Sequence, residues 1–168
     1  MTKNHENTDP TSTDSTSTAD ADAQDPTRVE VDHFYPHPPS KVWRALTTPE
    51  LMEKWLMPTT FAPVVGHQFT FTAQPIEATN FSGKIACEVL ELVDEELLKI
   101  SWTDAENPGA TDWTVSWTLK PEGAGTRVFL LHDGFDADDE FQQLSRKFMG
   151  GGWANHIPRA LGDVLEGM

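Results

Sequence analysis

Hydrophobic and polar positions alternate in short stretches through most of this chain. The clearest alternation runs from Trp113 to Lys120, where tryptophan, valine and leucine occupy every second position. Successive side chains of a strand point to opposite faces, so this pattern predicts a strand with one buried face. The same reasoning predicts further strands over residues 28–34, 64–71, 81–92, 98–103 and 126–132.

Turn residues separate the predicted strands. Asn107-Pro108-Gly109 precedes the Trp113 strand, and a segment rich in proline and glycine follows it. Short strands joined by turns predict an antiparallel meander. The face that must be covered carries Phe69, Phe71, Trp102, Trp113, Trp117 and His132. Phe129 and Leu131 then point to the opposite face.

Helical spacing appears in two places. Residues 39–58 predict two short helices after the first strand, because Thr48-Pro49-Glu50 is typical of a helix start and divides the segment. Residues 138–149 predict a short helix, and residues 153–166 predict the last one. We expect Gly150-Gly151-Gly152 to interrupt or loosen the helix, and Pro158 to kink it or delay its start.

The last predicted helix is the long element that can cover the inner face of the sheet. A curved sheet around one helix, lined by bulky aromatic side chains, readily leaves an internal cavity. The predicted fold class is therefore α+β, with a curved antiparallel sheet wrapped around a long C-terminal helix.

Composition divides the chain into two parts. Residues 1–26 consist largely of Thr, Ser, Asp and Ala, and such a segment buries too little to offset the entropy of ordering. We therefore expect a disordered acidic tail over 1–26 and a single domain over 27–168. The N-terminus has no apolar run, which indicates a cytoplasmic protein without a membrane span.

Charge and candidate chemistry narrow the function. The formal net charge of −15 argues against nucleic acid or an anionic membrane as a partner. The six histidines show no metal-ligand spacing, so we expect neither a metal nor a cofactor. The one cysteine, Cys87, lies in an inward row and is expected to be an inert core thiol. His132 is the one imidazole expected to face the interior, either as a satisfied core histidine or as a polar anchor for a ligand.

Several short motifs follow one another in an order that resembles a known family. They are HPPSKVWRALTTPELMEKWL, VGHQFTF, CEVLEL, LLKISWT, LLHDGF and GGGW with ALGDVL. Over about residues 28–167 they resemble the family of proteins like the C-terminal domain of the activator of heat-shock-protein-ninety ATPase. That family belongs to the SRPBCC superfamily, also called START-like or Bet v 1-like. The resemblance implies a helix-grip fold with a deep cavity between the sheet and the C-terminal helix.

The resemblance also implies which residues form the cavity wall. The residues that match wall positions of the family are Trp43, Trp55, Phe71, Trp102, Trp117, His132 and Trp153. The inward rows of the predicted sheet add Phe69 and Trp113. No catalytic residue is implied, because most members of the family resemble binding proteins rather than enzymes.

Three functions remain open from the sequence. The first is binding of a small hydrophobic or aromatic molecule in the cavity without catalysis. The second is a co-chaperone-like module that stimulates a heat-shock-protein-ninety-type ATPase in the stress response. The third is a cyclase-like or hydrolase-like enzyme that uses the same cavity, for which His132 is the candidate residue. A homodimer through Phe129 and Leu131 is a further hypothesis.

Overall fold

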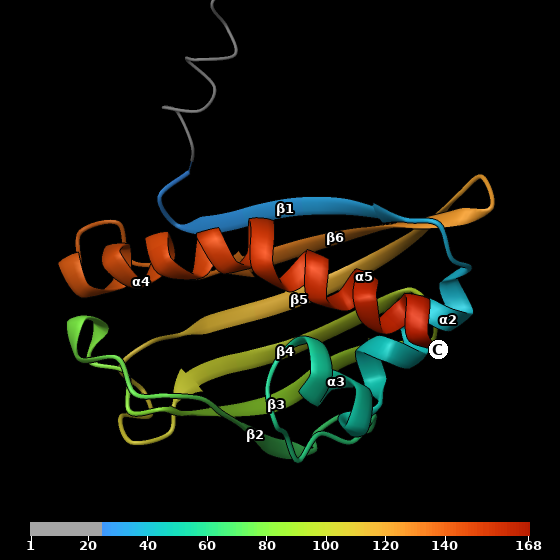
Figure 1. Cartoon of the computed structure of the whole chain (residues 1–168). Coiled ribbons are helices and arrows are strands. Elements are labelled where there is room, and N and C mark those ends of the chain that lie inside the picture. Colours follow the sequence, from blue (N-terminus) through green and yellow to red (C-terminus); the bar gives the residue numbers. More distant parts are fainter. Residues whose placement is uncertain (1–24) are drawn as a thin grey trace, which may run out of the picture.

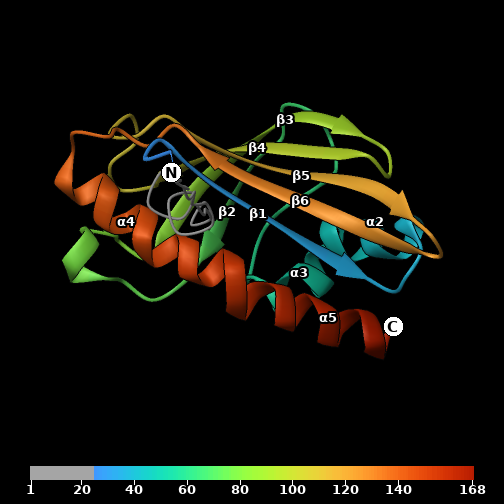
Figure 2. The ribbon, with the colours of Figure 1, turned by 90° about the horizontal axis from the view of Figure 1, so that it is seen from above.

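A computed structural model describes residues 25–168, so all but the last two residues of the expected disordered tail (1–26) lie outside the described residues. Six strands form one antiparallel sheet in the order β1-β6-β5-β4-β3-β2. The strands are β1 (Arg28–Tyr35), β2 (Gln68–Thr72), β3 (Lys84–Val93), β4 (Leu97–Asp104), β5 (Trp113–Glu122) and β6 (Gly125–Asp133). The sheet curves, and all the helices lie on its inner side (Figures 1 and 2).

The predicted inward rows of the sheet are confirmed. Buried residues alternate along β5 from Trp113 to Leu119, and along β6 at Val128, Leu130 and His132. Phe129 is exposed on the outer face, as the alternation predicts. Every one of the six strands contributes at least one buried residue to the core, so the inner face of the sheet is the floor of the molecule.

Two short helices, α2 (Pro39–Thr47) and α3 (Pro49–Trp55), connect β1 to β2 as predicted. Thr48 divides them, because its extended backbone ends one helix and Pro49 opens the next. Trp55 is buried, and its indole N–H donates to the carbonyl of Ala45 at 2.9 Å. This bond fixes the angle between the two helices and closes one end of the core.

The C-terminal helix is loosened but not broken where the sequence predicts that Gly150-Gly151-Gly152 interrupt or loosen it. It consists of α4 (Glu140–Gly151), a π-helical turn over Gly152–His156 (η2) and α5 (Ile157–Gly167). The amide of Ile157 donates to the carbonyl of Gly152, five residues earlier, and Pro158 follows directly. The wider π turn displaces the carbonyls that the proline ring would otherwise meet, so the chain passes Pro158 without leaving the helix.

The long helix crosses the inner face of the sheet from one end to the other (Figure 2). Leu161 and Leu165 of α5 are buried against the core, and Tyr35 donates its hydroxyl proton to the carbonyl of Pro158 at 3.2 Å. The α5 half is thus tightly packed, whereas α4 contains no fully buried residue. The predicted α+β fold, a curved antiparallel sheet wrapped around a long C-terminal helix, is confirmed. The two halves of that helix differ, because α5 packs against the core and α4 does not bury any residue fully.

Candidate functional site

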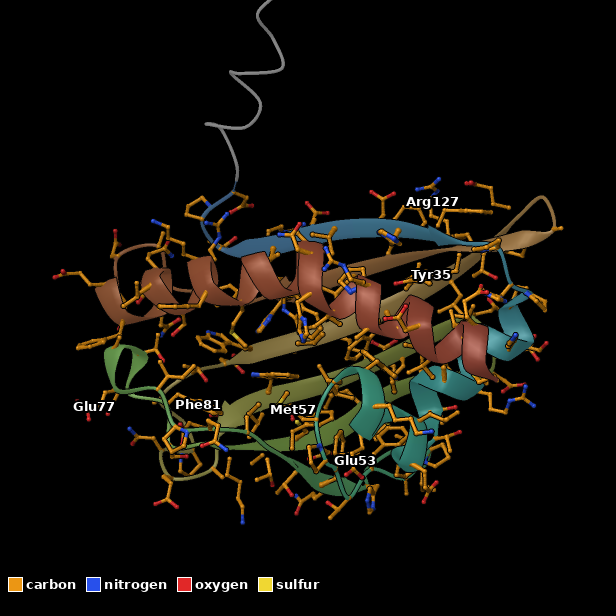
Figure 3. All side chains as sticks on the ribbon, viewed as in Figure 1. Tyr35, Glu53, Met57, Glu77, Phe81 and Arg127 are labelled. Atoms are coloured by element: carbon orange, nitrogen blue, oxygen red, sulfur yellow. The ribbon has the colours of Figure 1, made fainter. Side chains whose placement is uncertain are left out.

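A cavity of about 390 Å³ lies between α4 and the inner face of the sheet. Its other wall is the connection from β2 to β3, which contains a short 3-10 helix, η1 (Glu77–Thr79). Figure 3 labels Phe81 and Met57, two of the side chains that line this cavity, on the side opposite α4. The apolar lining comprises Leu56, Met57, Ile76, Phe81, Ile85, Trp102, Ala110, Trp113, Phe141, Phe148, Met149, Trp153 and Ile157.

One face of α4 forms the roof of the cavity. Phe141, Ser145 and Phe148 line it at the three- and four-residue spacing that places side chains on the same side of a helix. Phe141 is 62% exposed and Phe148 is 54% exposed. Two phenylalanines therefore face a hollow rather than the core, which leaves a large apolar surface without a partner among residues 25–168.

Polar contacts, rather than buried apolar ones, hold α4 in place. The guanidinium of Arg146 donates to the carbonyls of Arg28 (2.9 Å) and Asp25 (2.8 Å) at the start of β1. On the cavity side, the indole N–H of Trp113 donates to the side-chain oxygen of Gln142 at 3.1 Å. These bonds fix the height of the helix above the sheet without filling the space beneath it.

Trp153 closes the inner end of the cavity. It lies in the π-helical turn and is 2% exposed, and its indole N–H donates to Nδ1 of His132 at 3.0 Å. His132 is 0% exposed and lies behind the wall, in ring contact with Trp102, Trp113 and Phe135 as well as Trp153. Because Nδ1 accepts a hydrogen bond, the neutral ring carries its proton on Nε2, which has no partner among the described residues.

Burial lowers the pKa of His132 from 6.5 to about 3. Below pH 6.5 the unfolded chain therefore binds a proton that the folded protein excludes, and stability falls as the pH drops towards 3. We expect this group to remove about 2 kcal/mol of unfolding free energy between pH 7 and pH 5, at about 1.4 kcal/mol per pH unit.

Urea denaturation of the wild-type protein and of His132→Gln at both pH values checks this prediction. The variant lacks the titrating ring, so its loss of stability between the two pH values should be smaller by about the same 2 kcal/mol. Equal losses in the two proteins would show that folding does not lower the pKa of His132.

Except for Trp43, the other aromatic side chains predicted for the site belong to a continuous cluster around and behind the cavity. Trp153 contacts Trp117, which in turn contacts Trp55, with ring centroids 5.9 and 6.2 Å apart. Trp102 contacts Phe71 at 5.5 Å, and Phe71 contacts Phe69 at the same separation. Edge-to-face and tilted contacts of this kind stabilise a core beyond the area that they bury.

Of the nine residues predicted for ligand binding, Trp102, Trp113 and Trp153 line the cavity. Trp55, Phe69, Phe71 and Trp117 lie deeper and pack against one another, and His132 lies behind the wall. Trp43 is buried on α2, outside this aromatic cluster. The structure therefore brings the three lining tryptophans together and places the remaining six in the core around them.

Several lining residues have no counterpart in the sequence-based prediction. Phe141 and Phe148 could have been predicted from the sequence, since side chains seven residues apart lie on the same face of a helix. Ile76 could not, because it belongs to a segment predicted as a turn, and Phe81 is predicted as the start of a strand that begins instead at Lys84. The structure pairs their backbones through two hydrogen bonds of 3.0 and 2.9 Å and so holds Phe81 against the cavity.

Two carboxylates, Asp104 and Asp139, are among the residues that line the cavity. Burial alone would raise the pKa of Asp104, but hydrogen bonds from the amide and hydroxyl of Ser82 and from the amide of Glu106 hold that pKa below its usual value. Asp104 is therefore ionised at neutral pH. Asp139 is the N-cap of α4 and accepts a hydrogen bond from the amide of Gln142 at 3.0 Å.

Within residues 25–168, no group of three or more histidine, cysteine, aspartate or glutamate side chains is placed to hold a metal ion. Cys87 is buried in β3, and burial raises the pKa of its thiol well above the usual range, as befits an unreactive core side chain. No helix of the described residues combines the length and hydrophobicity needed to cross a membrane.

Comparison with known proteins identifies relatives of the whole described fold. The model of a family described as "Activator of Hsp90 ATPase homolog 1-like protein" matches residues 36–166. None of the curated proteins compared with the chain matches it. The crystal structure of protein MLL2253 from Mesorhizobium loti is 33% identical, covers 84% of this chain and 98% of its own, and superposes with a TM-score of 0.72.

More distant structures share the fold. Protein BH1534 from Bacillus halodurans is 23% identical over 83% of this chain and 99% of its own, with a TM-score of 0.65. Aha1 from Colwellia psychrerythraea, solved in solution as a dimer, is 18% identical over 83% of this chain and 96% of its own, with a TM-score of 0.65.

Proposed function

This chain belongs to the family of Activator of Hsp90 ATPase homolog 1-like proteins, and we propose that it binds a small hydrophobic or aromatic molecule in the cavity beneath α4, without catalysis. The observation that carries this proposal is the unburied apolar face of α4, which lines a cavity of about 390 Å³. Small-molecule sites are typically concave, largely apolar and of this order of size.

The composition of the lining supports a ligand with aromatic or aliphatic character. Tryptophan and phenylalanine side chains come from both the sheet and the helix, so a flat or branched apolar molecule would contact both sides. Gln142, Ser145, Asn107 and Thr111 provide a few polar groups in the lining. A ligand would cover the surface of Phe141 and Phe148 that the protein itself leaves exposed, and this burial would supply the driving force.

The proposal favours binding over catalysis because of the position of His132. Its Nδ1 is engaged by Trp153, and its ring is separated from the cavity by the tryptophans that form the wall. A general base must come within hydrogen-bond reach of the substrate. The enzyme hypothesis depends on His132, and in this arrangement His132 does not reach the cavity.

Amide hydrogen exchange with a neutral fluorescent probe tests the proposal. Prodan is uncharged and changes its emission in apolar surroundings, so its titration reports occupancy. Because α4 has no buried residue, we expect its amides to exchange readily in the free protein and about tenfold more slowly when the cavity is occupied. The amides of β5, at the centre of the sheet, are the internal control and should not change.

A result in which prodan binds and α4 exchanges as before would place the probe elsewhere. A result in which prodan does not bind at all would contradict the proposal itself. The two outcomes are separable because emission and exchange are measured on the same samples.

A second candidate is a chaperone-directed module, which the description of the matching family favours. In this case the chain would stimulate the ATPase of a heat-shock-protein-ninety-type chaperone. A stimulation assay with the host chaperone tests it, and the Ser145→Trp variant discussed below separates the two functions. If the Ser145→Trp variant, whose cavity is filled, still stimulates the ATPase, any chaperone contact is independent of ligand binding.

Self-association through the outer face of β6 remains a proposal. Phe129 is exposed there and Leu131 is half-buried beside it. The Aha1 protein from Colwellia psychrerythraea, which shares the fold, forms a dimer. Sedimentation of the wild-type protein against Phe129→Ser would show whether this face contributes to a dimer of the present chain.

A further inference from the structure

The charged side chains that line the cavity indicate the charge of its ligand, which the apolar lining does not. Among the described residues that line it, Asp104 and Asp139 are charged and there is no lysine, arginine or histidine. A second hollow adjoins the first, shares Asp104 with it, and adds Glu77 and Glu106. Every ionisable side chain that lines either hollow is therefore a carboxylate.

These carboxylates are not neutralised by ion pairs within residues 25–168. The salt bridges of the described residues join other groups, mainly along β1, β6 and the β5–β6 turn. Asp104 receives its hydrogen bonds from neutral donors, which leave its full negative charge in place. Asp139 likewise accepts a hydrogen bond from a neutral backbone amide, that of Gln142, so neither carboxylate of the cavity is neutralised by that hydrogen bonding.

The aromatic walls act in the same direction. The faces of Trp102, Trp113, Phe81, Phe141 and Phe148 carry the negative side of the ring quadrupole, and an organic cation between such faces is attracted by it. A carboxylate ligand would instead lose its hydration among apolar side chains and face two further carboxylates without a basic partner. The net charge of −15 also attracts cations and repels anions as they approach the protein from solution.

On these grounds we infer that the cavity selects hydrophobic organic cations, such as substituted ammonium compounds with an apolar body, over carboxylates of the same size. The inference rests on the proposed ligand-binding function and specifies the class of ligand. The apolar body would lie under α4 against Phe141 and Phe148, and the cationic head would lie towards Asp104 and Asp139.

Displacement of prodan by three ligands that share one alkyl chain tests this inference. The ligands are decyltrimethylammonium, decanol and decanoate, which differ in the charge of the head group. We expect the cation to displace prodan at a concentration at least about tenfold lower than decanoate, with decanol between them, and added salt should narrow the gap.

Two substitutions locate the effect, and one controls for it. Asp139→Asn keeps a good N-cap for α4 and removes one charge, so the preference for the cation should fall several-fold. Asp104→Asn removes the other charge but disturbs the hydrogen bonds of Ser82, which makes Asp139→Asn the cleaner variant. Glu53, labelled in Figure 3, is exposed on α3 and does not line the cavity, so Glu53→Gln removes the same charge and should leave the preference unchanged.

The outcomes separate the inference from the function on which it rests. If decanoate displaces prodan as well as the cation does, or if Glu53→Gln weakens the preference as much as Asp139→Asn, the inference is overturned and ligand binding stands. If prodan and all three ligands fail to bind, the proposed function fails and the inference with it.

Discussion

Replacing Trp153 with alanine is expected to lower the free energy of unfolding by about 3–5 kcal/mol, the range observed when a buried aromatic side chain is removed. Trp153 is 2% exposed and contacts the rings of Trp102 and Trp117. Its removal also leaves Nδ1 of His132 without its donor, in a ring whose other nitrogen already lacks a partner among the described residues. Denaturant unfolding of the purified variant measures the change.

Trp153→Phe separates the two causes. It keeps an aromatic ring in the cluster and removes the indole N–H, so we expect a smaller loss of about 1–3 kcal/mol, the cost of leaving a buried acceptor unpaired. A loss below about 1 kcal/mol for Trp153→Ala would contradict the role given to this residue, because a buried and hydrogen-bonded tryptophan cannot be removed so cheaply.

Replacing Ser145 with tryptophan should reduce the affinity for prodan by about a hundredfold, equivalent to about 2.7 kcal/mol. Ser145 lies on the cavity face of α4 between Phe141 and Phe148. The new indole would occupy the space that a ligand needs, and it would bury part of the two phenylalanine rings. We expect the stability of the protein to remain unchanged or to rise, since the substitution fills a hollow rather than a packed core.

Leu144→Trp is the matched control for this prediction. Leu144 precedes Ser145 on the same helix, but its side chain is partly exposed and does not line the cavity. The same large side chain at that position should leave prodan binding within about twofold of the wild-type value, as expected for a surface change. Equal losses of affinity in the two variants would mean that the probe does not bind under α4.

Much of the sheet could be predicted from the sequence because each strand carries its own signal. Alternation from Trp113 to Leu119 shows which face of β5 is buried, and the alternation of Val128, Leu130 and His132 along β6 correctly places His132 inside the core. Thr48-Pro49 correctly divides the two short helices. These features depend on neighbours in sequence, so a pattern within about ten residues suffices to show them.

The C-terminal helix and the cavity depend on contacts between distant residues, and the sequence predicted them less well. Three glycines and Pro158 predict an interruption or a loosening, but they do not show which. The helix widens into a π turn and continues, while Arg146 and Trp153 hydrogen-bond it to β1 and β6. The aromatic rows correctly predict a large apolar interior. They do not show that Trp55, Phe69, Phe71 and Trp117 pack together while α4 stands away from the sheet.

Native mass spectrometry of the freshly purified protein tests the central claim most directly. We expect a folded species heavier than the mass of the sequence, whose excess is lost on denaturation and is a small molecule with a hydrophobic or aromatic body. The emptied protein should take up one equivalent of prodan, and the Ser145→Trp variant should carry neither. A protein that shows the mass of the sequence alone and takes up no prodan in excess would contradict the claim that the cavity beneath α4 is a ligand-binding site.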